Sequence, residues 1–334
     1  MSDTHDTSSQ TDGHRRQTEL ADADVALDET GIDRDQPESG GPTASLWGDA
    51  WRELRRNPIF IISSTLIIIM VLMAIFPRLF LWFYNGQPER DCQLAYSVQN
   101  VNAPAGGRPT GTNWFGFDVQ GCDYYVKTIL GARISIFTGV LVTLGATIIA
   151  LVLGSISGYY GKWIDALIAR ITDVWFAIPT ILGAIVLLSV MGKRGMVQVA
   201  FILTVLGWPS MLRLMRSSVI SVKEMDYVSA SRALGANDFR LITRHILPNA
   251  IAPVIVYATI YVGVIISAEA ALSFLGVGVQ LPAISWGLMI NSAQSRILQA
   301  PHLLFFPGLF LAITVLSFIL MGDALRDALD PKLR

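Results

Sequence analysis

Six long apolar stretches divide the chain, and each is free of aspartate, glutamate, lysine and arginine. They cover residues 59–77, 134–161, 174–192, 195–212, 246–268 and 303–322. A bilayer core about 30 Å thick is crossed by about 20 apolar residues in a helix. Because lipid offers no hydrogen bonds to the backbone, such stretches are expected to be helical. The pattern therefore predicts an all-α integral membrane protein with six transmembrane helices.

A further uncharged stretch, residues 270–295, has a different pattern. Gly276, Gly278 and Pro282 interrupt it, and its end is rich in serine, asparagine and glutamine. We expect the end of the fifth helix followed by a re-entrant or interfacial segment, with a seventh span as the alternative. Pro179 similarly predicts a kink within the third apolar stretch.

The distribution of basic residues predicts the orientation. They gather before the first apolar stretch (52–56), between the fourth and fifth (213–244) and after the sixth (326–334). With six spans these regions share one side, which the positive-inside rule assigns to the cytosol. Both termini are then cytosolic and the loop over residues 82–132 faces outward. Lys193 and Arg194, in a short outer turn, run against this rule.

Composition supports a membrane body with a soluble tail. The 334 residues are 52% hydrophobic and 15% charged, and the mean hydropathy is +0.49. Residues 1–46 contain eleven acidic residues against three arginines. Such a segment cannot bury enough apolar area to offset its chain entropy, so we expect a disordered, cytosolic tail. Residues 47–132 then form the first membrane helix and outer loop, and residues 133–334 a core with five helices.

The two cysteines of the chain, Cys92 and Cys122, both fall in the predicted outer loop. An oxidising compartment favours a disulfide between them. Two unpaired thiols are the alternative.

The segment over residues 223–248 lies between two spans and is too polar to insert. It is expected to form two short helices, with one face of the first made of Tyr227, Ala230, Ser231 and Leu234. Gly235 suits a left-handed cap at the end of the first helix, Asn237 or Asp238 can cap the second, and Pro248 suits the first turn of the fifth span. A rigid projection of this kind can dock into a partner protein; equally, it can lie on its own bundle.

The sequence contains no motif for catalysis, nucleotide binding or metal binding. The sequence has no phosphate-binding GxxxxGK[ST] loop. Its four histidines and two cysteines form no metal-spaced cluster, and no nucleophile and base stand at a catalytic spacing. We expect no enzyme, no metal site and no bound cofactor.

The same segment resembles the loop signature of binding-protein-dependent ABC importer permeases. That signature is Glu-Ala-Ala, three residues, glycine, nine residues and Ile-x-Leu-Pro. Ser229, Ala230 and Ser231 occupy the triplet, and Arg232, Ala233 and Leu234 the three positions after it. Gly235 is the glycine, and Leu247 and Pro248 form the ending, with His245 where the generic pattern has isoleucine. The ending RHILPN resembles the dipeptide and oligopeptide branch. The segments GTNWFGFDVQG, GARISI, EAALSFLGVGVQLPAISWG and GDALRDALDPKLR are similar to its C-type subunit, which includes nickel permeases.

This resemblance implies a type I ABC importer permease fold and a set of partners. They are a homologous B-type permease, two cytosolic ATPases that bind the ATP, and an extracytoplasmic solute-binding protein, all at the plasma membrane. The expected function is ATP-driven import of di- or oligopeptides. Alternatives are a nickel or glutathione importer, a scaffold that docks an ATPase without transport, and a secondary transporter.

Two positions carry specific expectations. Ser229 replaces the acidic residue of the signature, so a family ion pair there is lost, although Glu224 and Asp226 lie close by in the sequence. Glu269 is an acidic residue at the outer end of the fifth span, where it either lines the translocation path or gate, or pairs with polar groups of residues 270–295.

Overall fold

A computed structural model describes residues 46–84, 106–192 and 194–329. The chain divides into two compact units, Met1–Asp49 and Ala50–Arg334. Of the first unit only the start of helix α2 (Leu46–Leu54) is described, so the predicted acidic tail lies almost entirely outside the described residues. The second unit is a bundle of helices.

Every regular element in the described part of the chain is a helix, and the loops contain one isolated bridge between Phe117 and Asp123. The long helices are α3 (Pro58–Ile75), α5 (Tyr124–Tyr160), α8 (Met196–Lys223), α12 (Ala252–Phe274) and α14 (His302–Leu329). Two shorter ones, α6 (Lys162–Phe176) and α7 (Thr180–Met191), follow each other closely. The prediction of an all-α membrane protein is confirmed.

Five of these helices are long and apolar enough to cross a membrane, and α6 with α7 makes a sixth candidate if the pair, bent by 80°, is one span. The bend falls at Ala177–Pro179, as the proline predicts. Proline has no N–H to donate and disfavours a helical conformation in the residue before it, which ends α6 and starts α7. The third span, expected over residues 174–192, is therefore a broken one that begins earlier, at Lys162.

The fifth span also differs from its expected limits. Helix α12 begins at Ala252, and Pro253 stands in its first turn. Pro248 instead occupies the first turn of a separate short helix, α11 (Leu247–Ala250). The expectation for Pro248 was wrong because the second proline, which cannot donate a backbone hydrogen bond, restarts the helix further on.

The stretch after α12 is a turn and a short helix. Gly276 has a φ of +77° and ends the α12 segment, and α13 (Trp286–Ala293) has only eight residues. Eight helical residues span about 12 Å, far less than a bilayer core. The described residues thus contain a helix end with a re-entrant or interfacial segment and no seventh span.

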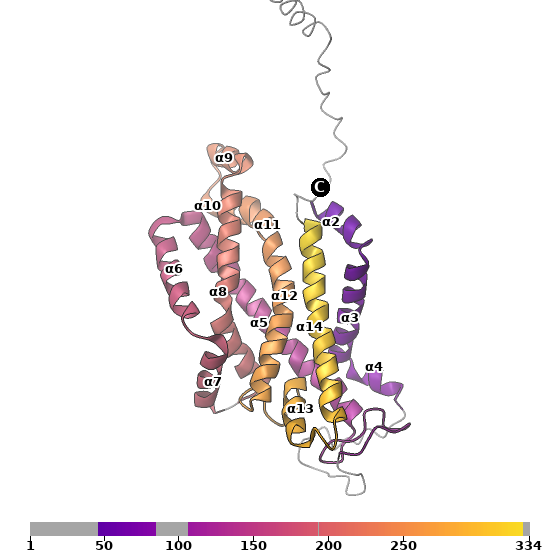
Figure 1. Cartoon of the computed structure of the whole chain (residues 1–334). Coiled ribbons are helices and arrows are strands. Elements are labelled where there is room, and N and C mark those ends of the chain that lie inside the picture. Colours follow the sequence, from indigo (N-terminus) through magenta and orange to yellow (C-terminus); the bar gives the residue numbers. More distant parts are fainter. Residues whose placement is uncertain (1–45, 85–105, 193, 330–334) are drawn as a thin grey trace, which may run out of the picture. The chain divides into compact units, whose positions relative to one another are not determined.

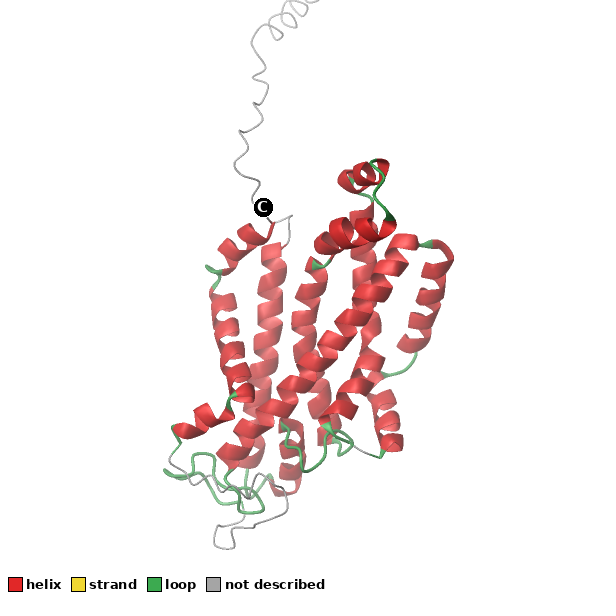
Figure 2. Ribbon diagram, turned by 180° about the vertical axis from the view of Figure 1, so that it is seen from behind, coloured by secondary structure: helices red, strands yellow, loops and turns green. Residues whose placement is uncertain are grey.

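Figures 1 and 2 show how the second unit is arranged. The ends of α5, α8 and α14 and the start of α3 lie at one end, together with α9 (Asp226–Ala233). The residue 106–123 loop, α4 (Pro77–Trp82) and α13 lie at the opposite end. The start of α3 and the end of α14 thus lie at the same end of this unit and the residue 106–123 loop lies at the other, as the predicted topology requires.

Helix α5 is the central element and packs most extensively against α8. Glycines make this close packing possible. A Cβ on Gly154 would lie 2.8 Å from Met215 Cβ, and one on Gly158 would lie 2.9 Å from Val219 Cβ. At the cytosolic end an ion pair joins α6 to α8, since Arg216 donates two hydrogen bonds of 2.5 and 2.6 Å to Asp165. Helices α5 and α8 are therefore closely packed, and α6 is tied to α8.

Candidate functional site

The projection over residues 224–250 stands at the end of the bundle where α8 finishes (Figure 1). Its first helix, α9, ends in a motif that the glycine makes possible. The Ala236 N–H donates to Ser231 O at 3.1 Å, and the Gly235 N–H donates to Arg232 O at 3.0 Å. Gly235 has a φ of +85°, a conformation that costs other residues energy. The predicted left-handed cap is confirmed.

The second half of the projection starts at a side-chain cap. Asn237 Oδ1 accepts a 2.8 Å hydrogen bond from the Arg240 N–H, so Asn237 rather than Asp238 fills the capping position. Helix α10 (Asp238–Arg240) then continues as a π-helical turn, Leu241–Ile246, into α11. The expected second helix is thus real, but it contains an irregular turn. Such turns often occur at functional sites.

Apolar side chains anchor the projection to the bundle. Val228, Leu241 and Ile246 are completely buried and belong to the same core cluster as Val219 of α8. Their burial removes the inner face of the projection from solvent, which stabilises it against the spans. The projection is therefore held rigidly and does not merely hang from two linkers.

Several large apolar side chains of the projection are nevertheless exposed, among polar and charged ones. The side chain of Leu234 is 89% exposed and that of Phe239 is 76% exposed. Tyr227 and Met225 are also exposed. These residues lie in the polar segment between two candidate spans and not within a span. An exposed apolar patch on a rigid support is typical of a protein-binding surface.

Tyr159, at the end of α5, links the spans to the projection. The hydroxyl of Tyr159 donates a 2.6 Å hydrogen bond to Asp238 Oδ1, and its carbonyl oxygen accepts one of 2.5 Å from Lys223 Nζ. The Arg232 guanidinium lies 5.9 Å from the centre of its ring. One buried side chain thus joins α5 to the end of α8, to α9 and to α10.

Most of the residues predicted for this site are exposed to solvent, and three are half-buried. The exposed ones are Tyr227, Ser229, Ala230, Arg232, Ala233, Leu234, Gly235 and Pro248. The half-buried ones are Ser231, His245 and Leu247. Ser231 Oγ donates back to Tyr227 O, so its hydroxyl is used within the helix.

Sequence reasoning missed two contributors. Phe239 could have been identified from the sequence, because it is an aromatic residue in an otherwise polar turn. Tyr159 carried none, because its role depends on the meeting of helix ends that lie far apart in the sequence.

Charge on the projection is mixed. Asp226 begins α9 one turn before Ser229, so its carboxylate shares the face on which the signature has an acid. Glu224 ends α8 and is exposed. Partial burial raises the pKa of the Tyr227 phenol above its ordinary value, so this side chain stays neutral at physiological pH.

Glu269 lies within α12 and is completely buried. Ser273 Oγ donates to its Oε1 at 2.7 Å, and Ser135 Oγ of α5 donates to its Oε2 at 3.2 Å. The same two hydroxyls accept hydrogen bonds from the backbone N–H groups of Val279 and Trp286. Glu269 therefore organises the segment that follows α12 and ties it to α5.

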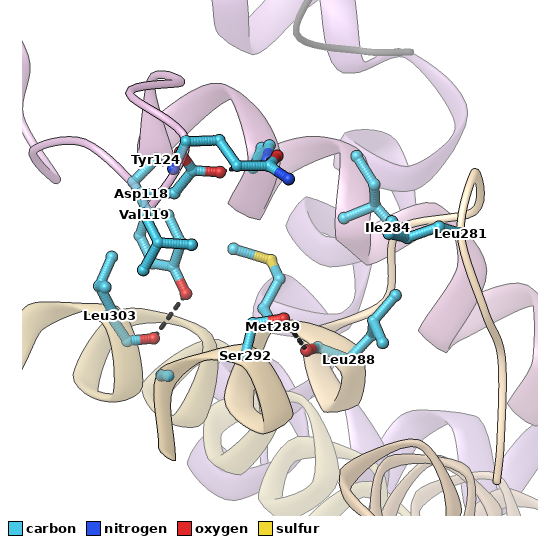
Figure 3. A pocket seen from close by; sticks show the side chains of 12 residues that line it. Asp118, Val119, Tyr124, Leu281, Ile284, Leu288, Met289, Ser292 and Leu303 are labelled. Carbon is cyan, nitrogen blue, oxygen red and sulfur yellow. Dashed lines mark hydrogen bonds and ion pairs between the residues drawn. The ribbon is translucent and has the colours of Figure 1, made fainter. Parts of the chain in front are cut away.

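At the outer end, the residue 106–123 loop is held by buried carboxylates. Asp118 Oδ1 accepts two backbone hydrogen bonds of 2.8 Å, and its Oδ2 pairs with Lys127. A cavity of about 90 Å³ separates this loop from α13. Figure 3 shows Tyr124 pointing across it toward Leu303, whose carbonyl oxygen accepts a 2.5 Å hydrogen bond.

Cys122 is buried in this loop and is disulfide-bonded. Cys92, the other cysteine of the chain, lies outside the described residues. Their pairing stays a prediction. Among the described residues, no group of three or more histidines, cysteines, aspartates or glutamates is placed to hold a metal ion.

These features define a class of protein. Five or six candidate membrane spans and a packed projection that exposes large apolar side chains define an integral membrane protein able to dock a partner. Comparison with known proteins gives the family. Residues 150–334 match the family described as binding-protein-dependent transport system inner membrane component. Residues 45–104 match the N-terminal TM domain of oligopeptide transport permease C.

Individual relatives agree. The chain is 40% identical to the oligopeptide transport system permease protein OppC of Bacillus subtilis, over 87% of this chain and 91% of the relative. It is 38% identical to the dipeptide transport system permease protein DppC of Alkalihalophilus pseudofirmus, over 89% and 94%. It is 35% identical to the glutathione transport system permease protein GsiD of Pectobacterium atrosepticum, over 86% and 92%.

The chain belongs to the family of binding-protein-dependent ABC transporter permeases, in its OppC/DppC-type branch. It is a multi-pass inner membrane protein and not an enzyme, and the ATP of its transport cycle binds to partner ATPase subunits. ATPase and solute-binding partners follow from this family.

Proposed function

We propose that this permease subunit imports short peptides. The main support is that this chain is 38–40% identical, over nearly its whole length, to relatives named for dipeptide and oligopeptide transport. The 35% identical relative is named for glutathione, which is itself a tripeptide. A glutathione importer is therefore the second candidate, and nickel import remains the further alternative.

Uptake into vesicles tests the solute. The assembled importer, with its own solute-binding protein, is reconstituted and supplied with ATP and labelled dipeptides, oligopeptides, glutathione or Ni²⁺. We expect accumulation of peptides that depends on ATP and on the binding protein. Accumulation of glutathione alone, or of nickel alone, would contradict the peptide assignment. ATP hydrolysis without uptake of any solute would favour a scaffold.

The second proposal concerns the docking surface. The exposed side chains of Leu234 and Phe239 would enter a groove of an ATPase subunit, while Val228 and Leu241 hold the projection against the spans. Removing two large apolar side chains from water stabilises such a contact by about 1.5–3 kcal/mol for each. Asp226 would supply the acidic charge that Ser229 lacks.

Photo-cross-linking tests this contact. A photoreactive amino acid replaces Leu234 in the assembled importer, and a matched control replaces Val190, an exposed apolar residue of α7. We expect the probe at residue 234 to capture an ATPase subunit and the control at residue 190 to capture none. Capture of lipid or of the chain's own helices from residue 234 would refute the docking role.

We further propose that a homologous B-type permease completes the pathway. The exposed apolar side chains on α7, among them Leu182, Val186 and Val190, suit lipid or a second membrane subunit. Glu269, by contrast, is enclosed by this chain's own serines. Its proposed role is to position the outer segment rather than to contact the solute.

A further inference from the structure

The short helix α4 leaves the end of α3 at an angle to the spans (Figure 1). Its inner side is tied to the bundle. Tyr125 donates a 3.2 Å hydrogen bond to Phe80 O, and the ring of Tyr84, just beyond the helix, lies 4.6 Å from that of Tyr125. This fixes which side of α4 faces outward.

The outer side of α4 is apolar and uncovered. Trp82 is 78% exposed, Phe83 is 69% exposed, and Leu79 is also exposed. Tryptophan near the end of a transmembrane helix is typical of the boundary between lipid tails and headgroups. A short helix across this boundary buries its apolar side chains in the bilayer.

An open depression of about 620 Å³ lies beside this helix, and two arginines line it. Arg78 comes from α4 and Arg133 from α5, and both side chains are exposed. Among the described residues, neither guanidinium has a hydrogen bond or an ion pair. The other lining residues are apolar: Ile75, Phe76, Pro77, Leu79 and Trp82.

Two arginines together with apolar lining residues suit a ligand that has both a negative charge and an apolar part. Arginine binds phosphate through paired N–H groups, and Trp82, which also lines the depression, is typical of the boundary between lipid tails and headgroups. We propose that this depression binds an anionic phospholipid of the outer leaflet. Arg78 and Arg133 would hold its phosphodiester, and Leu79 and Trp82 would contact its glycerol and upper acyl chain.

Lipid retention by the intact importer tests this proposal. The complex is purified into nanodiscs made of phosphatidylcholine with a minor fraction of phosphatidylglycerol, and native mass spectrometry measures the bound lipid. We expect the doubly substituted R78Q/R133Q complex to retain phosphatidylglycerol about tenfold more weakly. The matched control is Arg296→Gln, an exposed arginine at the same end that does not line the depression.

Additional variants and a labelling experiment distinguish a bound lipid from a second protein subunit or free phosphate. The R78K/R133K variant keeps the charge and should restore much of the retention. A photoreactive amino acid at residue 79 should label lipid. Equal phosphatidylglycerol retention by R78Q/R133Q and the unaltered complex would overturn the proposal. So would labelling of a second permease subunit from residue 79, or displacement of the lipid by millimolar inorganic phosphate.

Discussion

The hydroxyl of Tyr159 donates a 2.6 Å hydrogen bond to Oδ1 of Asp238, and so the last turn of α5 is bonded directly to the projection. Helix α5 runs from the outer loop to this point, and at its other end Ser135 bonds Glu269. One helix therefore connects the cytosolic projection with the outer segment. A movement imposed on the projection has a direct route into the spans.

Replacing Tyr159 with phenylalanine should weaken this route. The change removes one hydrogen bond worth about 1 kcal/mol and leaves the buried ring in place. We expect peptide uptake to fall several-fold while ATP hydrolysis continues, measured on the reconstituted importer. Tyr160→Phe is the matched control, since the neighbouring Tyr160 is exposed and should tolerate the change. Equal loss of uptake and hydrolysis would indicate a simple assembly defect instead.

Gly235→Ala should loosen the projection without any steric clash. No atom lies within 4 Å of a Cβ placed there, but the φ of +85° is unfavourable for alanine. The expected cost is about 1 kcal/mol, concentrated on the end of α9. Uptake should fall while the complex still reaches the membrane, and a bulkier residue should abolish uptake.

The control for this glycine is Gly308→Ala in α14. That site is also open, and its backbone does not have a positive φ. Normal uptake by a bulky variant at residue 235 would argue against a role for the rigid projection in coupling.

Glu269→Ala should release the segment after α12. The change leaves the hydroxyls of Ser135 and Ser273 without their acceptor in a buried site, at a cost of about 2 kcal/mol. We expect faster hydrogen exchange at the backbone amides of Val279 and Trp286, which bond to these hydroxyls. Ser267→Ala on the same helix is the control, because Ser267 bonds only its own helix backbone. Unchanged exchange at both amides would remove Glu269 from this positioning role.

Gly158→Leu should separate α5 from α8. A Cβ at this position would lie 2.9 Å from both Arg216 O and Val219 Cβ, so a larger side chain forces the helices apart. Overpacking of this kind costs about 1–3 kcal/mol. The measured thermal stability of the purified complex should fall, whereas Gly308→Leu, in open space, should change it little. If both variants are equally stable, close packing at residue 158 does not matter.

Much of the fold follows from local chemistry. The absence of charge from six stretches predicted the six crossings, and Pro179 predicted the break in the third. Gly235 predicted the first cap of the projection, and the pair Asn237 and Asp238 predicted the second, which the structure assigns to Asn237. Span limits were less predictable: α5 begins ten residues before the uncharged stretch, because Asp123 caps it and the polar start of the helix is protected by protein.

The sequence by itself determined the membrane class and the position of the projection between two spans, because burial in lipid and helix capping depend on residues close together in the chain. Only the tertiary structure decided which residues meet across the bundle. It brings Tyr159 to Asp238, Ser135 to Glu269, and Arg78 and Arg133 to one depression. These contacts join different helices, and the way helices pack depends on the fit of whole surfaces, which no single stretch of sequence records.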